Sequence, residues 1–248
     1  MNSWARLTAV ASTAAVLAGC AGTPTQDANP DDPWEGFNRR VYEFNDTLDR
    51  YALKPVAEGY DYVTPDLVQT GVGNFFSNLG EISNTFNSIL QWKWTNAGIS
   101  TSRFLLNTVL GLGGVLDPAG QMGLERHEED FGQTLATWGV GQGPFLVLPF
   151  LGPSTVRDAS GLPVDWYTDP VTYIEDDPTR WGVRAVHVVD TRAGLLDQEK
   201  LIQGDRYSFI RDTYLQRRQF LINDGKPGKD PFASGDDFGN FSDDDFAQ

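Results

Sequence analysis

An apolar run from Phe145 to Leu151 lies in a stretch crowded with glycine and proline, and this combination restricts the fold more than any other feature of the chain. The run is too short to cross a bilayer as a helix, which needs about 20 apolar residues. Glycine permits unusual backbone angles and proline interrupts hydrogen-bonded structure, so this density of both excludes a long regular helix. We expect a bent, non-repetitive hairpin or lip, followed by a helix that Ser154 caps.

Two interpretations of this run are open. A short apolar segment is most often a buried connection in the core. Alternatively, the segment contacts lipid, and it then supplies a row of apolar side chains to a membrane-facing lip. The residues concerned are Phe145, Leu146, Val147, Leu148, Pro149, Phe150 and Leu151.

The N-terminus carries an export signal. One positive charge precedes a short apolar region, and small residues lead to Cys20, as is typical of a secretory signal peptide. The string L-A-G-C at residues 17–20 resembles the lipobox of bacterial lipoproteins, in which the cysteine is acylated. The alternative is an ordinary signal peptide that happens to contain a cysteine. We predict a signal peptide over residues 1–19, a covalent lipid on Cys20 with no other cofactor, and a flexible tether over residues 20–31.

The net charge of −15 restricts the possible partners. Binding to a nucleic-acid backbone needs clustered lysine and arginine, so we do not expect this acidic chain to bind nucleic acid. The acidity also argues against broad adsorption to anionic lipid headgroups. Cys20 is the only cysteine, so no intramolecular disulfide is expected after export.

Apolar residues at helical spacing predict a first helix after the tether. Asp32 is its expected cap, with Pro33 in the first turn and Glu35 completing a capping box. A structural amphipathic helix packs its apolar face on the core, whereas in a lipid-anchored protein such a face alternatively lies against acyl chains. This face consists of Trp34, Phe37, Val41, Phe44, Leu48 and Tyr51.

Similar spacing predicts further helices near residues 64–79, 82–90, 96–110, 178–196 and 205–222. The glycine-rich segment 111–118 has no Gly-Lys-Ser/Thr ending, so we predict a turn and not a phosphate-binding loop. Residues 224–248 hold many aspartates and little apolar surface, which predicts a disordered acidic tail. The predicted fold class is therefore all-α, with one helical domain over residues 32–223.

Residues suited to catalysis are sparse. His127 precedes three acidic residues, but the spacing does not match H-E-x-x-H, so we predict no metal site. The segment around Ser154 lacks the final glycine of a nucleophile elbow, which does not support a hydrolase, although a triad scattered through the sequence stays open. We expect His187 to pack within a helix, and we predict no catalytic residue.

Four arginines, Arg206, Arg211, Arg217 and Arg218, give local positive charge to the last predicted helix of this acidic chain. Arg211, Arg217 and Arg218 either contact a lipid phosphate or form structural ion pairs with nearby carboxylates.

Three segments together resemble one known family. They read D-P-W-E-G-F-N-R-R-V-Y-E-F-N-D from Asp32, S-R-F-L-L-N-T-V-L-G-L-G-G-V-L-D-P from Ser102, and F-G-Q-T-L-A-T-W-G-V-G-Q-G-P-F-L-V-L-P-F-L-G-P-S-T-V-R-D from Phe131. With the lipobox, they are similar to the MlaA (VacJ) family of outer-membrane lipoproteins over residues 32–222. The family has Thr in place of Ser102, and the acidic tail departs from the family core.

The resemblance implies an all-helical, ring- or disc-like protein held in the inner leaflet of the outer membrane, on its periplasmic side. Such a protein removes mislocalised phospholipids from the outer leaflet through an amphipathic channel and passes them to a periplasmic lipid carrier, which maintains lipid asymmetry. It associates with a trimeric porin and is not an enzyme. We expect the Phe145–Leu151 run to form the channel lip or wall, supported by Phe44 and Asn45, with Arg211, Arg217 or Arg218 near headgroups.

Two rival classes share part of this pattern. A lipid-anchored phospholipase would have the same signal peptide and lipobox and the same apolar lip. A structural lipoprotein would tether a partner protein and extract no lipid.

Overall fold

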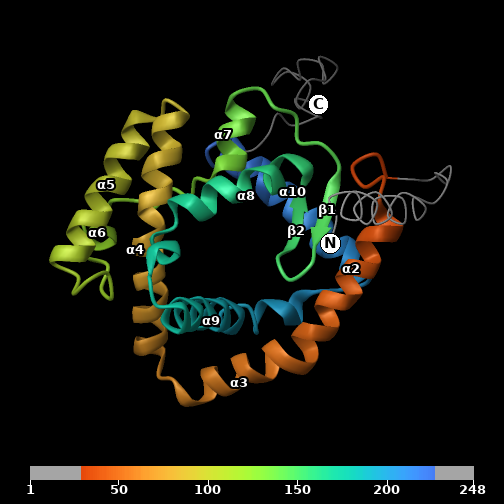
Figure 1. Cartoon of the computed structure of the whole chain (residues 1–248), viewed down its shortest axis with the longest axis horizontal. Coiled ribbons are helices and arrows are strands. Elements are labelled where there is room, and N and C mark those ends of the chain that lie inside the picture. The colour runs from red at the N-terminus through yellow and green to blue at the C-terminus, as the bar shows by residue number, and fades with distance from the viewer. Residues whose placement is uncertain (1–28, 227–248) are drawn as a thin grey trace, which may run out of the picture.

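The computed structural model describes residues 29–226, which form a chain of helices with one short hairpin (Figure 1). The predicted signal peptide, Cys20 and the acidic tail beyond residue 226 lie outside the described residues. The elements confirm the predicted all-α fold class, to which the structure adds one two-stranded sheet. In chain order they are α2 (Glu35–Leu48), η1 (Asp49–Leu53), α3 (Lys54–Val63), α4 (Asp66–Leu90), α5 (Trp94–Val109), α6 (Pro118–Gln121), α7 (Phe131–Thr137), β1 (Phe145–Leu148), β2 (Gly152–Thr155), α8 (Val156–Thr168), η2 (Pro170–Tyr173), α9 (Asp177–Ala193), η3 (Gln198–Leu201) and α10 (Arg206–Ile222).

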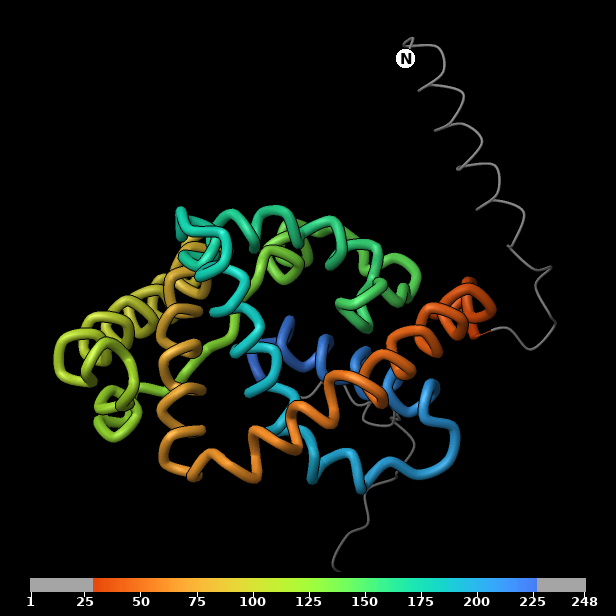
Figure 2. Tube along the Cα trace, turned by 60° about the horizontal axis from the view of Figure 1, so that its bottom comes forward, coloured from red at the N-terminus to blue at the C-terminus, as the bar shows by residue number. Residues whose placement is uncertain are grey.

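The helices follow one another around a ring, which confirms the predicted ring-like arrangement (Figure 1). α2, η1 and α3 form one continuous curved rod along one side of it (Figure 2). The bend falls at η1, a π-helical turn that directly precedes α3 and its Pro55. Proline lacks an N–H group and its ring crowds the preceding turn, so the wider π-helical turn accommodates it without breaking the rod.

α4 forms one wall of the ring, α5 lies along its outer side, and the contact between the two helices is polar (Figure 1). The buried carboxylate of Glu81 accepts a 2.8 Å hydrogen bond from Nε of Arg103. The same guanidinium donates to Asp117 at 3.1 Å and to the carbonyl oxygen of Leu124 at 2.6 Å. These bonds fix α5 and the segment that follows it onto α4.

α4 is a single helix of 25 residues, so the predicted break between residues 79 and 82 is wrong. Gly80, between the two predicted helices, costs about 1 kcal/mol relative to alanine inside a helix. The buried contacts of Asn78, Glu81 and Asn84 on either side of Gly80 offset it.

The predicted turn over residues 111–118 is confirmed. Gly114 has a φ of +99°, in the left-handed region that favours glycine, and a Cβ at this position would lie 2.7 Å from Cβ of Asn78. The turn therefore packs directly against α4, which only glycine permits here.

Two predicted helix caps are wrong. Asp32 does not cap the first helix, which begins at Glu35 without a side-chain cap. Instead, the Asp32 carboxylate is buried and accepts hydrogen bonds from Asn38 and Tyr207. Ser154 belongs to strand β2, and Thr155 caps α8 by accepting the Asp158 N–H at 3.2 Å.

The polar contact between α4 and α5 generates a prediction about stability. Replacing Arg103 by Met removes the 2.8 Å charged partner of the buried Glu81 carboxylate and leaves it only Asn84 and, at 4.0 Å, Arg126. This loss should lower the free energy of unfolding by about 3–5 kcal/mol. Thermal unfolding in mild detergent, followed by circular dichroism, measures this change.

Arg50→Met is the matched control. Arg50 pairs with Asp46 at 2.8 Å, but its side chain is 61% exposed. Loss of such a surface pair should cost at most about 1 kcal/mol. Equal destabilisation of the two variants would contradict the assigned role of the buried pair.

Candidate lipid-contact site

Among the described residues, many polar side chains are buried and many large apolar side chains are exposed. Buried polar or charged residues outnumber buried hydrophobic ones, and the buried faces of α4 and α5 consist largely of polar residues such as Asn84, Asn87, Ser100 and Asn107. The opposite faces of these helices expose Ile89, Leu105 and Val109 to the surroundings. A protein surrounded by water usually shows the reverse distribution. Large continuous apolar surfaces mark contact with lipid or with another protein.

The apolar face of α2 follows the same rule. Trp34, Phe37, Phe44 and Leu48 are each 37–49% exposed, and Tyr51 in η1 is 78% exposed. Val41 is the exception, because it packs against the small core around Phe145. Of the two interpretations of this face, the structure favours the one in which most of it stays outside the core.

The predicted lip divides into a buried part and an exposed part. β1 and β2 pair in antiparallel register from Phe145 opposite Thr155 to Leu148 opposite Gly152, so the predicted hairpin is regular at its base. Phe145 and Val147 are buried against Tyr207, whereas Leu146 and Leu148 on the other face are half-buried. The predicted core connection is thus correct for Phe145 and Val147.

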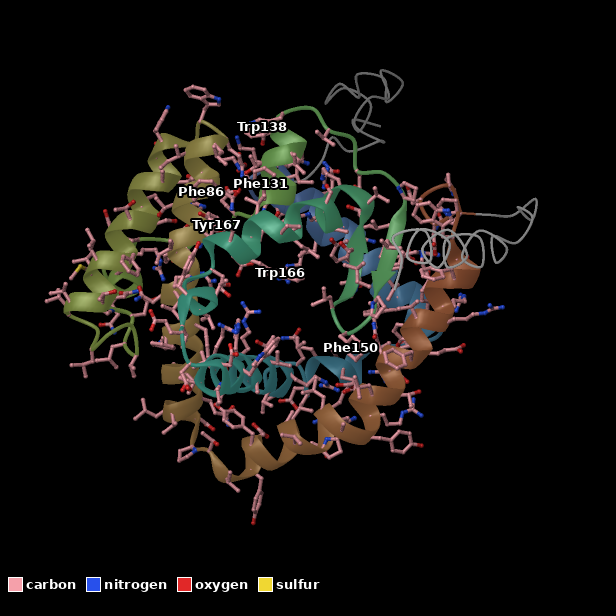
Figure 3. All side chains as sticks on the ribbon, in the orientation of Figure 1. Phe86, Phe131, Trp138, Phe150, Trp166 and Tyr167 are labelled. Atoms are coloured by element: carbon pink, nitrogen blue, oxygen red, sulfur yellow. The ribbon has the colours of Figure 1, made fainter. Side chains whose placement is uncertain are left out.

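The tip of the hairpin remains exposed. Phe150 is 73% exposed, Leu151 is 55% exposed, and Pro149 between strand and tip is also exposed. Phe150 has a φ of 66°, a conformation that non-glycine residues rarely adopt and that is often found at functional sites. Figure 3 shows Phe150 next to α2 at the inner side of the ring, where its ring meets that of Phe44 edge-on at 5.3 Å. Trp166 of α8 is labelled at the inner side as well and is 48% exposed.

Two asparagines of α2 hold the hairpin by its free edge. Asn38 donates to the carbonyl oxygen of Phe145 at 3.0 Å and accepts the N–H of Val147 at 2.9 Å. Asn45 donates to the carbonyl oxygen of Leu148 at 2.9 Å and accepts the N–H of Phe150 at 2.9 Å. We call Asn38 and Asn45 the amide pair.

The amide pair takes the place of a third strand. An isolated two-stranded hairpin leaves the outer edge of each strand without hydrogen-bond partners. Each side-chain amide directs an N–H donor and its carbonyl acceptor at the strand edge, which matches the alternating carbonyl and N–H groups there. The sequence placed Asn45 near the lip but missed Asn38. Their recurrence on one helix face two turns apart was the available signal.

A cavity with a volume of ≈ 390 Å³ lies beneath the hairpin, between α2, α10 and the end of α9. Apolar side chains of Phe145, Val147 and Tyr207 form part of its lining, and an ion-pair network borders it. In this network Arg192 contacts Asp49 at 2.7 Å and Glu199 at 2.6 Å, and Arg206 contacts Glu199 at 2.6 Å. Desolvation raises the pKa of Glu199, but the hydrogen bonds from these arginines outweigh it and lower that pKa to about 2. The border of the cavity is therefore charged, but its arginines and carboxylates neutralise one another.

The predicted headgroup arginines are mostly engaged within the protein. Arg211 is buried and pairs with Asp32 at 3.4 Å and with Asp212 at 2.9 Å. Arg218 is buried between Asp130 and Asp158. Of the two predicted roles, the ion pairs of Arg211 and Arg218 favour the structural one for these two residues. Arg217 is 67% exposed and pairs with Glu128 at 3.0 Å.

Arg218 joins three helices behind the hairpin. Asp130 caps α7 by accepting the N–H of Gln133 at 2.9 Å, and Asp158 belongs to the first turn of α8. Asp165 of α8 accepts the N–H of Phe131 at 2.8 Å nearby. Burial raises the pKa of Asp165 to about 6, and the negative charge of Asp130 contributes to the same direction.

The residues considered for catalysis are engaged in packing or pairing. Within the described part of the chain, no group of three or more histidine, cysteine or acidic side chains is arranged to hold a metal ion. Glu129 pairs with Lys93 at 2.9 Å. The ring of His187 stacks on Phe76 with centroids 4.2 Å apart, which confirms its predicted packing role. The Ser154 hydroxyl is buried and donates to a carbonyl oxygen.

Residues 29–226 contain no helix with both the length and the hydropathy needed to cross a membrane. A helical ring with a polar interior, an exposed apolar surface and a hydrogen-bonded apolar hairpin defines a class of lipid-facing helical proteins. The chain belongs to the MlaA lipoprotein family, whose model matches residues 30–221.

Individual relatives agree with this assignment. The chain is 38% identical over 236 residues to the intermembrane phospholipid transport system lipoprotein MlaA of Escherichia coli (strain K12), covering 92% of this chain and 94% of the relative. It is 35% identical over 228 residues to the protein of the same name from Haemophilus influenzae, covering 89% and 91%. A solved structure described as "Structural basis for maintenance of bacterial outer membrane lipid asymmetry" matches with a TM-score of 0.69 at 38% identity, covering 77% of this chain and 99% of that one.

The amide pair generates a prediction about the hairpin tip. Replacing Asn45 by Leu removes both hydrogen bonds to the tip while keeping a helix-forming side chain of similar size. The amide hydrogen of Phe150 should then exchange with solvent about tenfold faster, since the net contribution of such bonds is about 1–1.5 kcal/mol. Hydrogen–deuterium exchange with mass spectrometry measures the rate.

Thr47→Ala serves as the control, because the Thr47 hydroxyl donates within α2 to the carbonyl oxygen of Glu43 and does not contact the hairpin. Its exchange pattern at residues 149–151 should equal that of the wild type. Unaltered exchange at Phe150 in the Asn45 variant would show that other contacts hold the tip.

The raised pKa of Asp165 predicts a pH dependence of stability. In the folded state this carboxyl holds its proton up to about pH 6, and in the unfolded state only to about pH 4. Stability from this group is therefore present at low pH and is lost as the pH rises through this window. Asp165→Asn should raise the free energy of unfolding at pH 7.5 by about 1–2 kcal/mol, after allowance for partial exposure, and should have little effect at pH 4. Unfolding titrations at both pH values test this, and equal effects at both would refute it.

Proposed function

We propose that this chain is an outer-membrane lipoprotein, anchored through acyl chains on Cys20, that removes mislocalised phospholipids from the outer leaflet. By this proposal the lipid leaves through an amphipathic passage in the ring and is handed to a periplasmic lipid carrier. The protein maintains lipid asymmetry and breaks no bond. The single observation that carries the proposal is the exposed apolar surface around a polar interior, with an apolar hairpin tip at the inner side of the ring.

Physical reasoning supports transport without chemistry. A phospholipid that leaves a bilayer through water exposes its tails, at a cost of about 0.8 kcal/mol for each CH₂ group. A passage with one apolar wall lowers this barrier. The exposed side chains of Phe150 and Leu151 at the tip and of Trp166 on α8 are suited to form such a wall.

The proposed anchoring follows from the same surface. A protein with broad apolar faces is stably held at a bilayer when a lipid anchor adds to its buried apolar area. The ring would lie in the inner leaflet of the outer membrane, facing the periplasm. A trimeric porin is the proposed partner in the membrane, on the basis of the family resemblance.

The hairpin tip provides the decisive substitution. The double variant Phe150→Asp, Leu151→Asp places two charges on the proposed wall, each of which opposes passage of an acyl chain. Transfer of fluorescent phospholipid from vesicles by the purified, anchored protein should fall at least about tenfold, since a single carboxylate in hydrocarbon costs more than 1.4 kcal/mol. The double variant Phe150→Leu, Leu151→Met keeps the wall apolar and should transfer at the wild-type rate.

The same assay separates the rival classes when intact and cleaved lipids are both scored by mass spectrometry. Intact lipid released by the wild type supports the proposal. Cleaved lipid would identify a phospholipase. Neither product, together with binding of a protein partner, would identify a tether. Undiminished transfer by the Asp variant would exclude the hairpin tip from the lipid path.

A further inference from the structure

A second apolar depression lies away from the hairpin, where α9 approaches α4. It has a volume of ≈ 750 Å³, within the range of small-molecule binding sites. α4, α9 and two residues of the turn after α5 line it, and we call it the α4–α9 groove. Among its lining residues are Leu67, Val72, Phe75, Val115, Val183 and Val186.

The groove contains no charged side chain, although the chain as a whole carries many acidic residues. Asn74 is one of its few polar residues, and its amide already donates to the carbonyl oxygen of Val115 at 3.1 Å. Two glycines contribute to the shape. Gly71 lies directly under Val115, and a Cβ at Gly182 would have no neighbour within 4 Å, so this side of α9 faces open space.

The apolar lining determines which class of ligand the groove can bind. An extended peptide has backbone N–H and C=O groups that need partners, and the groove offers almost none. An acyl chain has no polar groups along its length, so it gains from burial at about 0.8 kcal/mol for each CH₂ group without such a cost. The groove is also continuous with exposed apolar residues, since Leu67 is 79% exposed and Val186 is 46% exposed.

We propose that the α4–α9 groove binds one acyl chain of a phospholipid of the surrounding leaflet, at a site separate from the hairpin. This inference rests on the proposed function only in that it requires the exposed apolar surface to face lipid. Since Val115 and Leu116 reach the groove from the turn after α5, the bound chain would contact α4, α9 and this turn together.

The test uses the full-length, lipid-anchored protein in vesicles that contain a phospholipid with a photoactivatable diazirine on its acyl chain. After illumination, mass spectrometry locates the labelled residues. Labelling at Val72 and Val183 should clearly exceed labelling at Leu105 and Val109, which are exposed on α5 and represent transient contact with lipid.

Gly182→Trp fills the groove from α9, where an added Cβ would have no neighbour within 4 Å. Its indole displaces at least two methylene groups, so labelling at Val72 and Val183 should fall about tenfold. Gly59→Trp is the matched control, because Gly59 also lies on a helix with open space before it and does not line the groove. Should Gly182→Trp alter the circular dichroism spectrum, Thr179→Trp on the groove side of α9 replaces it.

Each outcome decides the proposal. Strong groove labelling that Gly182→Trp removes and Gly59→Trp preserves supports it. Labelling no greater than on α5, or labelling that the groove-filling variant leaves unchanged, overturns it. A protein partner that protects the groove from lipid overturns it too. Lipid transfer by the wild type is measured in parallel, so a protein that is labelled in the groove but transfers no lipid refutes the proposed function and leaves the groove site intact.

Discussion

The free edge of strand β1 must find hydrogen-bond partners, and the amide pair of α2 supplies them. Asn38 binds the base of the hairpin and Asn45 binds its tip, so four backbone groups of β1 and the turn are satisfied by two side chains. Asn38 also donates a hydrogen bond to the buried carboxylate of Asp32, which accepts another hydrogen bond from Tyr207 of α10. The hairpin, the start of α2 and α10 are thereby fixed to one another before any apolar packing is considered.

The burial of polar side chains between the helices has an energetic explanation. Buried ion pairs add little net stability relative to apolar packing in water, because both partners lose their hydration. In a protein whose outside faces lipid, however, apolar burial between helices brings little gain, because lipid tails are as apolar as the side chains themselves. Directional contacts such as those of Arg103 with Glu81 and of Arg218 with Asp130 then specify how the helices assemble.

The sequence predicted most of the long helices because their apolar residues recur at a helical period, and this period is set locally, but it predicted no helix at α3 or α7. The α9 and α10 helices lie within a few residues of their predicted bounds. The sequence could not predict the partners of polar residues, because these partners are distant along the chain. Asp32 looked like a cap because its neighbours favour one, yet Tyr207 and Arg211 bind it. The arginines of α10 looked available to headgroups because most of their carboxylate partners, such as Asp32, Asp130 and Asp158, lie on other elements.

The periodicity of the apolar residues also does not indicate whether protein or lipid covers them. An amphipathic helix reads the same whether its apolar face meets a protein core or a lipid, and only the fold distinguishes the two. On α2 the polar residues Asn38 and Asn45 turn inward to the hairpin, which leaves Phe37, Phe44 and Leu48 at the surface. The backbone requirement of a short hairpin thus decides which face of this helix is buried. By the proposed function, that same requirement makes the other face available to lipid.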